Sequence, residues 1–315
     1  MILAVDTSCY TTSMILVENE TGRILFELNK NLMVKPGERG LRQSEGFFQH
    51  VRQLTEAYDA LSREFDPRQI TLVAASSRPR PVEGSYMPVF HSGLFFALNI
   101  ANTLNVPIVQ TSHQEGHLMA ALITSGVVSI PQRFYGLHLS GGTTEMLDVT
   151  YINQQFDIKL LGGTLDLNFG QLIDRIGVKM GLAFPCGKAM DALAQKVSHQ
   201  EAFKIKNKTE TTFNLSGLEN KYLALMDTME HNHVCRHLFN TLAHILYKLI
   251  EPLDPNVPVV LSGGVSSNAI VKTMLCDHLK DRKLLFAKPE YARDNAYGVA
   301  EIGRRHRIIG DVNAD

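Results

Sequence analysis

Closely spaced cysteines are absent from this sequence. Its four cysteines, Cys9, Cys186, Cys235 and Cys276, lie far apart, and no two of them form a CxxC pair. This spacing argues against a zinc ribbon and against a framework of disulfides. Isolated cysteines are typical of proteins in a reducing compartment, so we expect a cytoplasmic protein.

Long hydrophobic runs are missing as well. No apolar stretch approaches the roughly 20 residues that a helix needs to cross a bilayer. Residues 1–6 lack the basic flank and the long apolar core of a signal peptide. We therefore expect no membrane partner.

An excess of one charge is absent too. The 315 residues include 31 basic and 32 acidic side chains, which gives a net charge of −1. This balance excludes a protein whose whole surface binds nucleic acid, but it allows a local basic patch. Hydrophobic residues make up 44% of the chain, enough for sizeable cores, and the length suits two domains better than one.

A pattern of strand, polar turn, strand and strand occurs twice. Short β-rich runs predict strands at residues 2–5, 13–17 and 24–28, and again at 134–139, 145–149 and 156–161. In each set, a turn of small and polar residues follows the first strand, at residues 6–8 and 140–144. The repeat predicts two related domains, residues 1–130 and 131–315, that face a shared nucleotide cleft. The last helix is expected to pack back on the first domain.

Helical patterns alternate with further strands. Phe47, Val51, Leu54 and Tyr58 recur at helical spacing and predict a helix at residues 44–63. Its apolar stripe would face the core or a second subunit, so a dimer through this helix is one expectation. Further helices are predicted at residues 93–104, 170–182, 231–250 and 297–304, and further strands at 70–75, 107–109, 258–261 and 284–287. This alternation is typical of an α/β protein.

Glycine-rich turns follow predicted strands at two places in the second half. Bare backbone at Gly141 and Gly142 would let N–H groups approach a phosphate without obstruction by Cβ atoms. A turn with Gly263, Gly264 and Asn268 lies after a strand and before a helix, where it suits a ribose or a purine ring. Each turn alone is a weak signal, but together they favour nucleotide binding.

A histidine pair stands at the start of another predicted helix. His113 and His117 are four residues apart, so both imidazoles lie on one helical face and could bind one metal ion. A zinc protease requires glutamate directly after the first histidine, and Gln114 holds that position here. The alternative is a pair that merely caps or packs the helix. Asp294, far along the chain, offers the oxygen ligand that a histidine pair lacks.

The order of the motifs resembles that of a known family. Along the chain come Asp6-Thr7-Ser8, His113-x-x-Gly116-His117, Ser140-Gly141-Gly142-Thr143, Gly170-x-x-x-Asp174, Ser216-Gly217-Leu218, Gly263-Gly264-Val265-x-x-Asn268 and Asp294-Asn295-Ala296. This series resembles the TsaD family, the tRNA N6-threonylcarbamoyladenosine synthases formerly called O-sialoglycoprotein endopeptidases, over nearly the whole chain. The resemblance implies the actin-like ATPase (ASKHA) fold, in which two ribonuclease-H-like domains surround a nucleotide cleft.

The resemblance also implies the residues of the site. One divalent metal ion per subunit, iron or zinc, would bind His113, His117 and Asp294, and Asp6 and Ser8 would be catalytic. ATP or an acyl-adenylate would bind nearby, with magnesium as a further candidate cofactor. The residues expected to hold this nucleotide are Leu139, Ser140, Gly141, Gly142, Thr143, Asp174, Gly187, Asp191, Gly263, Gly264 and Asn268.

The implied reaction is an acyl transfer. The family moves a threonylcarbamoyl group from threonylcarbamoyl-adenylate to N6 of adenosine 37 in tRNA. A bound metal ion can orient oxygen atoms and stabilise charge as the amine attacks. The implied partners are tRNA and proteins similar to TsaB and TsaE.

At four places the sequence departs from the family pattern. Tyr10 and Thr11 stand where bacterial members carry acidic residues, Thr143 replaces a histidine, and Cys186 replaces a glycine. The loop that usually reads Gly-Pro-Gly is here Arg78-Pro79-Arg80-Pro81. These differences predict a diverged bacterial paralogue that keeps the metal and nucleotide sites but has changed on the acceptor side.

Two alternatives to the synthase follow. One is a related carbamoyltransferase with another acceptor, and the other is a non-catalytic paralogue that acts as a partner or scaffold through the helix at residues 44–63. Retention of three metal ligands argues against the scaffold. The missing acidic residues argue for it.

Overall fold

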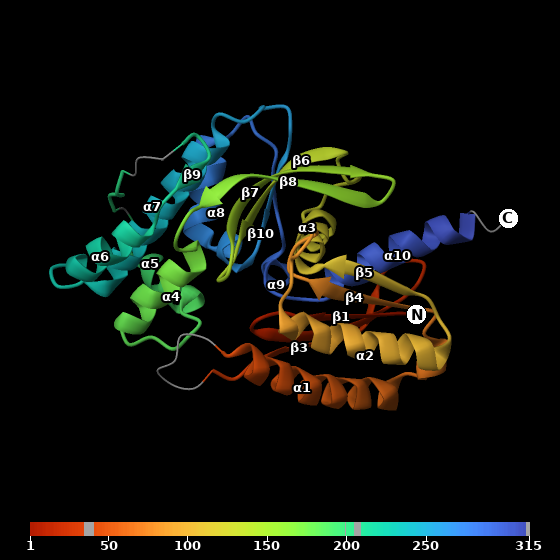
Figure 1. The fold of residues 1–315 in the computed structure, drawn as a ribbon. Helices are drawn as coiled ribbons and strands as arrows, with labels where there is room; N and C mark the ends of the chain where they lie inside the picture. The colour runs from red at the N-terminus through yellow and green to blue at the C-terminus, as the bar shows by residue number, and fades with distance from the viewer. Residues whose placement is uncertain (35–40, 199, 205–208, 313–315) are drawn as a thin grey trace. The chain divides into compact units, whose positions relative to one another are not determined.

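The chain forms two compact units, each with a sheet of its own (Figure 1). The computed structural model describes residues 1–34, 41–198, 200–204 and 209–312, with side chains to residue 307. Unit 1 comprises Met1–Ile123, Ile152–Phe156 and the segment that begins at Asp294. Unit 2 comprises Thr124–Tyr151 and Asp157–Arg293.

The sheet of unit 1 has five strands in the order β3-β2-β1-β4-β5. Its strands are β1 (Ile2–Thr7), β2 (Thr11–Val17), β3 (Ile24–Asn31), β4 (Leu72–Arg78) and β5 (Ile108–Ser112). β1, β2 and β3 pair antiparallel, which confirms the predicted meander, whereas β4 and β5 run parallel to β1. The central strand β1 is buried throughout because both faces of the sheet are covered.

Helices cover the two faces of this sheet. α1 (Gln43–Glu64) and α2 (Pro88–Leu104) lie side by side on one face, and α10 (Tyr297–Val312) packs on the other, as Figure 1 shows. Alternate residues of β1 divide between the two layers: Leu3 and Val5 face α1 and α2, while Ile2 and Ala4 face α10. α3 (His113–Thr124) follows β5 directly, and the short 3₁₀ helix η1 (Pro67–Gln69) precedes β4.

The predicted helices of unit 1 are present, with some shifted ends. α1 confirms the helix expected at residues 44–63 to within one residue at each end. α2 begins at Pro88 rather than at residue 93, because proline is well suited to the first turn of a helix. α10 continues beyond the predicted end at residue 304.

The sheet of unit 2 repeats the plan of unit 1. Its order is β11-β10-β6-β7-β8-β9, so β8-β7-β6-β10-β11 corresponds to β3-β2-β1-β4-β5. β7 is antiparallel to β6, and β10 and β11 are parallel to it. This confirms the repeat that the sequence predicted and adds the short edge strand β9, which was not expected. The strands are β6 (Arg133–Leu139), β7 (Thr144–Ile152), β8 (Gln155–Thr164), β9 (Thr212–Phe213), β10 (Val259–Ser262) and β11 (Leu284–Phe286).

The helices of unit 2 share one hydrophobic core with its sheet. Its helical segments are α4 (Phe169–Lys179), α5 (Gly187–Ala194), α6 (Ser216–Leu225), α7 (His231–Ile250), η2 (Gly264–Ser267), α8 (Ala269–His278) and α9 (Pro289–Ala292). α7 matches its predicted ends and packs against α5 and α8. α4 ends three residues before residue 182, where Gly181 adopts a positive φ of 84°. α6 was not predicted.

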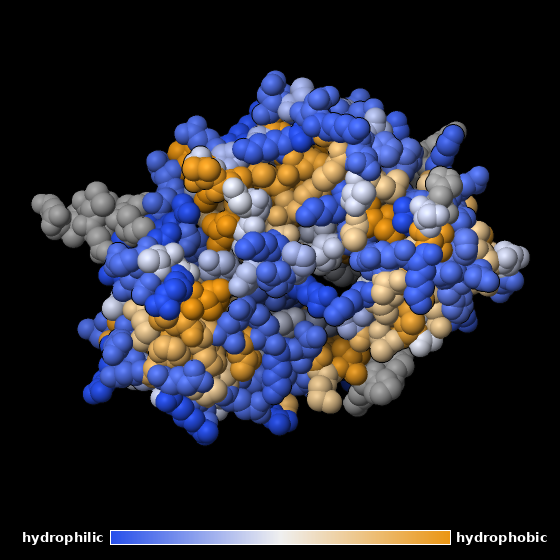
Figure 2. Space-filling model, turned by 180° about the vertical axis from the view of Figure 1, so that it is seen from behind, coloured by the Kyte–Doolittle hydropathy of each residue, from blue (hydrophilic) through white to orange (hydrophobic). Residues whose placement is uncertain are grey.

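The surface mixes hydrophilic and hydrophobic residues. On the face in Figure 2, hydrophobic residues form separate groups between hydrophilic ones. Phe48 and Val51 of α1 are exposed, whereas Leu54 of the same helix is buried, so the apolar residues of α1 do not all face the core. Among the described helices, none combines the length and hydrophobicity that a bilayer-spanning segment requires.

Candidate metal centre and glycine turns

The first turn of α3 is fixed by reciprocal capping bonds. The backbone N–H of Glu115 donates to Ser112 Oγ over 3.2 Å, and the backbone N–H of Ser112 donates to Glu115 Oε2 over 2.7 Å. This exchange satisfies amide groups that a helix start leaves without partners. Glu115 is therefore used to start the helix, while the position of a protease base, directly after His113, is held by Gln114. His113 and His117 follow on one face of α3.

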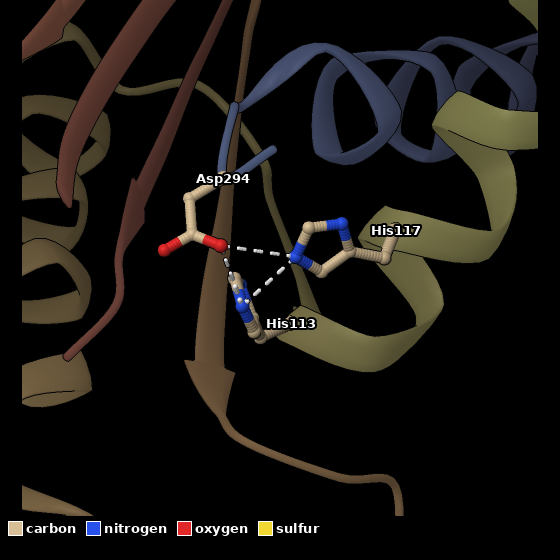
Figure 3. A group of neighbouring side chains, drawn as sticks. All are labelled: His113, His117 and Asp294. Atoms are coloured by element: carbon tan, nitrogen blue, oxygen red, sulfur yellow. Dashed lines mark hydrogen bonds and ion pairs between the residues drawn. The ribbon is translucent and has the colours of Figure 1, made fainter. Parts of the chain in front are cut away.

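The two histidines meet Asp294 in a tight triangle (Figure 3). His117 Nε2 lies 3.1 Å from His113 Nε2 and 3.2 Å from Asp294 Oδ1, and His113 Nε2 lies 3.6 Å from the same oxygen. Ligands of a tetrahedral ion with bonds of about 2.0–2.1 Å lie about 3.3–3.4 Å apart. Two imidazoles and one carboxylate at these separations fit zinc or ferrous iron.

The charges around the triangle favour a cation. Burial by itself lowers the pKa of His113, but the carboxylates of Asp6 and Asp294 outweigh it and raise the pKa well above its ordinary value. Burial by itself raises the pKa of Asp294, but hydrogen bonds from His113 and His117 hold it well below its ordinary range. Two carboxylates therefore act on one partly buried ring, and the same negative charge that stabilises a proton there would also stabilise a divalent cation.

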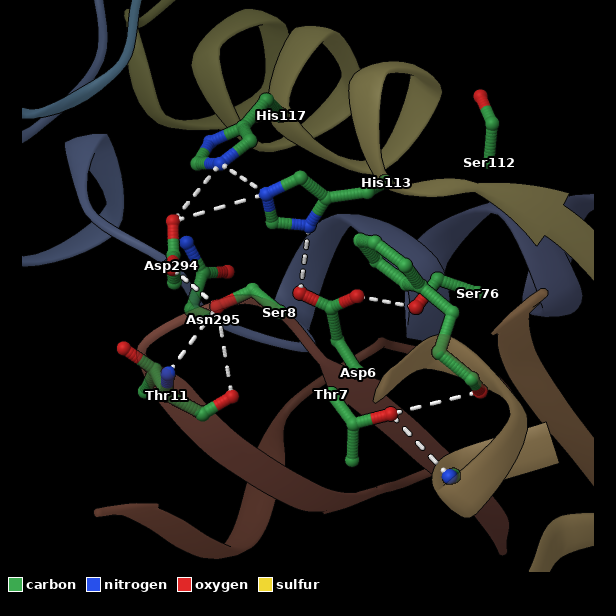
Figure 4. A network of polar contacts seen from close by, with 12 residues as sticks. Asp6, Thr7, Ser8, Thr11, Ser76, Ser112, His113, His117, Asp294 and Asn295 are labelled. Atoms are coloured by element: carbon green, nitrogen blue, oxygen red, sulfur yellow. Dashed lines mark hydrogen bonds and ion pairs between the residues drawn. The ribbon is translucent and has the colours of Figure 1, made fainter. Parts of the chain in front are cut away.

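The end of β1 and the turn after it contact two members of this triangle (Figure 4). Asp6 Oδ2 lies 2.8 Å from Nδ1 of His113, and Ser8 Oγ donates a hydrogen bond to Oδ2 of Asp294. The other carboxylate oxygen of Asp6 accepts a hydrogen bond from Ser76 Oγ on β4. Asp6 and Ser8 were both predicted as site residues, whereas Ser76 was not. The parallel pairing of β4 with β1 ends at Val5 and Ala75, the residues directly before Asp6 and Ser76, and so brings Ser76 to Asp6.

A buried polar network fixes Ser8 itself. Ser8 Oγ accepts hydrogen bonds from the backbone amides of Tyr10 and Thr11, and its carbonyl oxygen lies 2.8 Å from His50 Nε2. His50 is fully buried on α1, and its Nδ1 lies 2.7 Å from Thr12 Oγ1. The sequence analysis missed His50 because its position in α1 is 42 residues from Ser8. The turn is therefore anchored to a helix as well as to the sheet.

A close crossing of α3 and α10 lies next to the triangle. Gly116 lies between the two histidines on α3, and Gly298 lies four residues after Asp294, in the first turn of α10. A Cβ atom on Gly298 would lie 1.8 Å from the carbonyl oxygen of Gly116. Only glycine at position 298 allows this approach, so direct backbone contact between α3 and α10 places the segment with Asp294 next to the two histidines.

The glycine turn after β6 has the same closing hydrogen bond as the turn after β1. The Ser140 amide donates to the Thr143 carbonyl over 2.8 Å, just as the Ser8 amide donates to the Thr11 carbonyl over 3.0 Å. Cβ atoms on Gly141 and Gly142 would meet nothing within 4 Å, so their backbone is accessible.

The second glycine turn lies against the first. Gly263 has a φ of 85°, and its Cβ would lie 2.3 Å from the carbonyl oxygen of Leu139. This backbone conformation and this approach both require glycine. Gly264 starts η2, and Asn268 Oδ1 accepts from the Val271 amide and so caps α8.

The remaining predicted nucleotide residues lie at the start of α5 and next to it. Gly187 is the first residue of α5, with open space at its Cβ position. Asp174 Oδ1 accepts a 2.7 Å hydrogen bond from the Cys186 amide, and Asp191 Oδ2 lies 3.5 Å from the Ala269 amide beside Asn268. All eleven residues predicted for the nucleotide belong to unit 2, whereas the metal triangle with Asp6 and Ser8 belongs to unit 1.

Asp174 makes the folding stability of unit 2 depend on pH. Burial raises the pKa of Asp174 to about 6, and the bond from Cys186 only partly opposes this. Because the folded protein favours the protonated form, this stabilisation is present below about pH 4 and is lost as the pH rises through 6. Asp174→Asn should therefore gain stability relative to wild type between pH 4 and 7, by at most about 3 kcal/mol. Urea unfolding at several pH values measures the difference, and a difference that stays constant with pH would contradict the expectation.

Comparisons with known proteins agree with the fold and with the order of the motifs. A family model described as tRNA N6-adenosine threonylcarbamoyltransferase (TsaD) matches residues 44–301. Proteins of that name from Lactococcus lactis subsp. cremoris (strain MG1363) and from a Nitratiruptor species are 27% and 28% identical to this chain. The alignments cover 95% of this chain and 89% of the first relative, and 96% and 92% for the second.

Solved structures share the fold at low identity. HypF from T. kodakarensis has a TM-score of 0.60 at 14% identity, over 98% of this chain and 48% of that one. Component A of the Acidaminococcus fermentans (R)-2-hydroxyglutaryl-CoA dehydratase has a TM-score of 0.58 at 14% identity, over 98% of both chains. The predicted actin-like ATPase fold is thereby confirmed.

Proposed function

Because the chain belongs to the TsaD family of tRNA threonylcarbamoyltransferases, we propose that it transfers a threonylcarbamoyl group from threonylcarbamoyl-adenylate to N6 of adenosine 37 in tRNA. The family makes the protein a transferase of the threonylcarbamoyl type. The observation that carries the proposal is the His113–His117–Asp294 triangle, whose separations and charge suit one divalent ion.

The proposed ligands of that ion are the two imidazole Nε2 atoms and Asp294 Oδ1. The donor set favours zinc or iron. When bound, the ion supplies a Lewis acid that can polarise an oxygen of the substrate. His113 and Asp294 keep side-chain exposures of 16% and 23%, so one side of the triangle is accessible to a substrate.

The proposed nucleotide site lies on the two glycine turns and on α4 and α5. The accessible backbone at Gly141 and Gly142 would receive phosphate oxygens, and magnesium would assist if ATP were bound. Asn268, Asp191 and Gly187 would contact the rest of the nucleotide. Asp174 would retain a proton near pH 6 and so could donate a hydrogen bond to the ligand.

The reaction itself forms one bond and breaks another. The N6 amine of adenosine attacks the carbamoyl carbon, a C–N bond forms, the bond from that carbon to the phosphate oxygen breaks, and AMP leaves. One proton leaves the amine. Backbone amides that hold the phosphate would stabilise the charge that develops on the leaving group.

The proposed partners are tRNA and proteins similar to TsaB and TsaE, in the cytoplasm. Phe48 and Val51 on the exposed side of α1 offer apolar contacts for such a protein or for a second copy of the chain. This retains the dimer through residues 44–63 as a proposal.

A different acceptor is the second candidate function. The turn that anchors Ser8 carries Tyr10 and Thr11 where bacterial members of the family carry acidic residues. A change of residues so close to the metal triangle could change the group that accepts the carbamoyl moiety. A non-catalytic scaffold would not need the triangle at all.

The decisive experiment is a transfer assay. Purified protein is incubated with threonine, bicarbonate, ATP, an adenylate-forming enzyme and tRNA, with and without the two partner proteins. Nucleoside analysis by mass spectrometry should find threonylcarbamoyladenosine in tRNAs that read codons starting with A, and His113→Ala should abolish it. If the Lactococcus lactis relative modifies the tRNA under the same conditions and this chain does not, the adenosine 37 assignment is wrong.

A further inference from the structure

We propose that Asp6 and Ser8 are positioning residues that orient two of the metal ligands, rather than groups that act on the substrate. The inference rests on the metal site of the proposed function. It assigns each residue a definite partner: Asp6 orients the ring of His113, and Ser8 orients the carboxylate of Asp294. The first strand and its turn would then form an outer shell around the ion.

The contact of Asp6 fixes the tautomer of His113. Nδ1 of the ring lies 2.8 Å from Asp6 Oδ2, so it carries the proton and donates it to the carboxylate. When a metal ion replaces the second proton of the ring, Nε2 offers its lone pair on the side that faces His117 and Asp294. Ser76 donates to the second oxygen of Asp6 and so fixes the carboxylate in turn. A carboxylate behind a histidine ligand also makes the imidazole a better donor.

The hydrogen bond from Ser8 gives the two carboxylate oxygens of Asp294 different partners. Ser8 Oγ donates to Oδ2, which leaves Oδ1 directed at the two imidazoles. Ser8 can do this because its own position is over-determined: the amides of Tyr10 and Thr11 donate to its hydroxyl, and His50 holds its carbonyl.

Burial separates these two residues from the ligands themselves. Asp6 is 1% exposed and Ser8 is 2% exposed, whereas the side chains of His113 and Asp294 are 16% and 23% exposed. A substrate can therefore reach the ligands but not the oxygens of Asp6 and Ser8, which are already bonded to protein groups. A group that cannot touch the substrate can serve the reaction only through another residue.

Zinc affinity tests the inference without any transfer assay. The metal-free full-length protein competes with a chromophoric chelator for Zn²⁺, the only added ligand. Asp6→Asn keeps the shape and removes the charge, and Ser8→Ala removes the bond to Asp294. Each should weaken zinc binding by about 10- to 100-fold, and Ser76→Ala should weaken it by less because it acts through Asp6. Absorption spectra of the Co²⁺-loaded proteins should shift in the same variants, which a merely structural role would not produce.

Ser13→Ala is the matched control. Ser13 is a buried serine that pairs with Asp6 across β1 and β2, and its hydroxyl has no partner among the described residues. The Ser13→Ala protein should bind zinc with an affinity within twofold of wild type.

Asp6→Asn and Ser8→Ala proteins that fold and bind zinc as tightly as wild type would overturn the inference, even if the chain modifies tRNA. If Asp6→Asn does not fold, the zinc affinities of Ser8→Ala and Ser76→Ala test the inference. A wild-type protein that modifies tRNA but binds no zinc, iron or cobalt overturns the inference and leaves the transfer reaction standing.

Discussion

Asp294→Ala is expected to weaken zinc binding by more than about 100-fold, because loss of an outer-shell partner alone costs 10- to 100-fold and this change removes a ligand. Asp294 is the one carboxylate in the triangle, and two neutral imidazoles hold a divalent ion poorly without it. The hydrogen bonds from both histidines keep its pKa well below the ordinary range, so the wild-type group is ionised at neutral pH. Metal analysis after purification, together with chelator competition, measures the loss. Transfer activity should fall with metal content.

Asp277→Ala provides the control for this change. Asp277 is an exposed carboxylate on α8 of unit 2 and is not part of the triangle. Its removal changes net charge by the same amount and should leave the metal content unaltered. Equal metal content in wild type and Asp294→Ala would refute the ligand assignment for all three residues.

Among glycine-to-alanine substitutions in unit 1, Gly298→Ala is expected to be the most destabilising. The added Cβ would lie 1.8 Å from the Gly116 carbonyl oxygen and 2.8 Å from the Ala120 amide, and neither atom belongs to a flexible side chain. α10 must therefore move away from α3, and Asp294, four residues before Gly298, would move relative to both histidines. We expect a loss of about 3 kcal/mol in the free energy of unfolding, at the upper end for overpacking, together with weaker zinc binding.

Gly217→Ala separates this effect from the ordinary consequence of glycine in a helix. Gly217 lies in the first turn of α6, and a Cβ there would meet nothing within 4 Å. Alanine at that position should be neutral or stabilise the protein by up to about 1 kcal/mol. Chemical denaturation and zinc competition on both variants make the comparison. If Gly298→Ala behaves like Gly217→Ala in both measurements, the helix crossing does not control the site.

Local sequence patterns predicted most of the fold. Burial of both faces makes the first four residues of β1 an apolar run, and the polar residues that follow predict a turn, so the strand and its turn are visible without any partner. The same signal at Ser140 predicted the second copy. α6 escaped prediction because its first turn follows Asn214 and Leu215 without an apolar repeat, and Asp166 rather than a neighbouring side chain caps it. A cap supplied by a residue 50 positions away leaves no local pattern.

The site was predicted less completely, for a physical reason. Helical spacing placed His113 and His117 on one face, whereas Asp294, 177 residues from His117, was connected with them by its ligand chemistry and by the family resemblance, not by any spacing. Ser76 and His50 were missed because their roles depend on strand register and on the docking of α1. Serine and histidine are common residues, and contacts between residues far apart in the sequence leave no local periodic pattern from which they could be predicted.

Unit 1 is built from segments that unit 2 separates in the sequence, and this order affects how the protein can fold during synthesis. The unit contains β1 with Asp6 and Ser8, the two histidines of α3, and Asp294 at the start of the final segment, while nearly all of unit 2 lies between the last two. A ribosome makes residues in order, and domains tend to fold as they emerge. Unit 2 can thus fold before unit 1 has its last ligand or its covering helix α10. The part of the chain that is made first is therefore completed last, and with the proposed ligands metal loading would follow translation of unit 2.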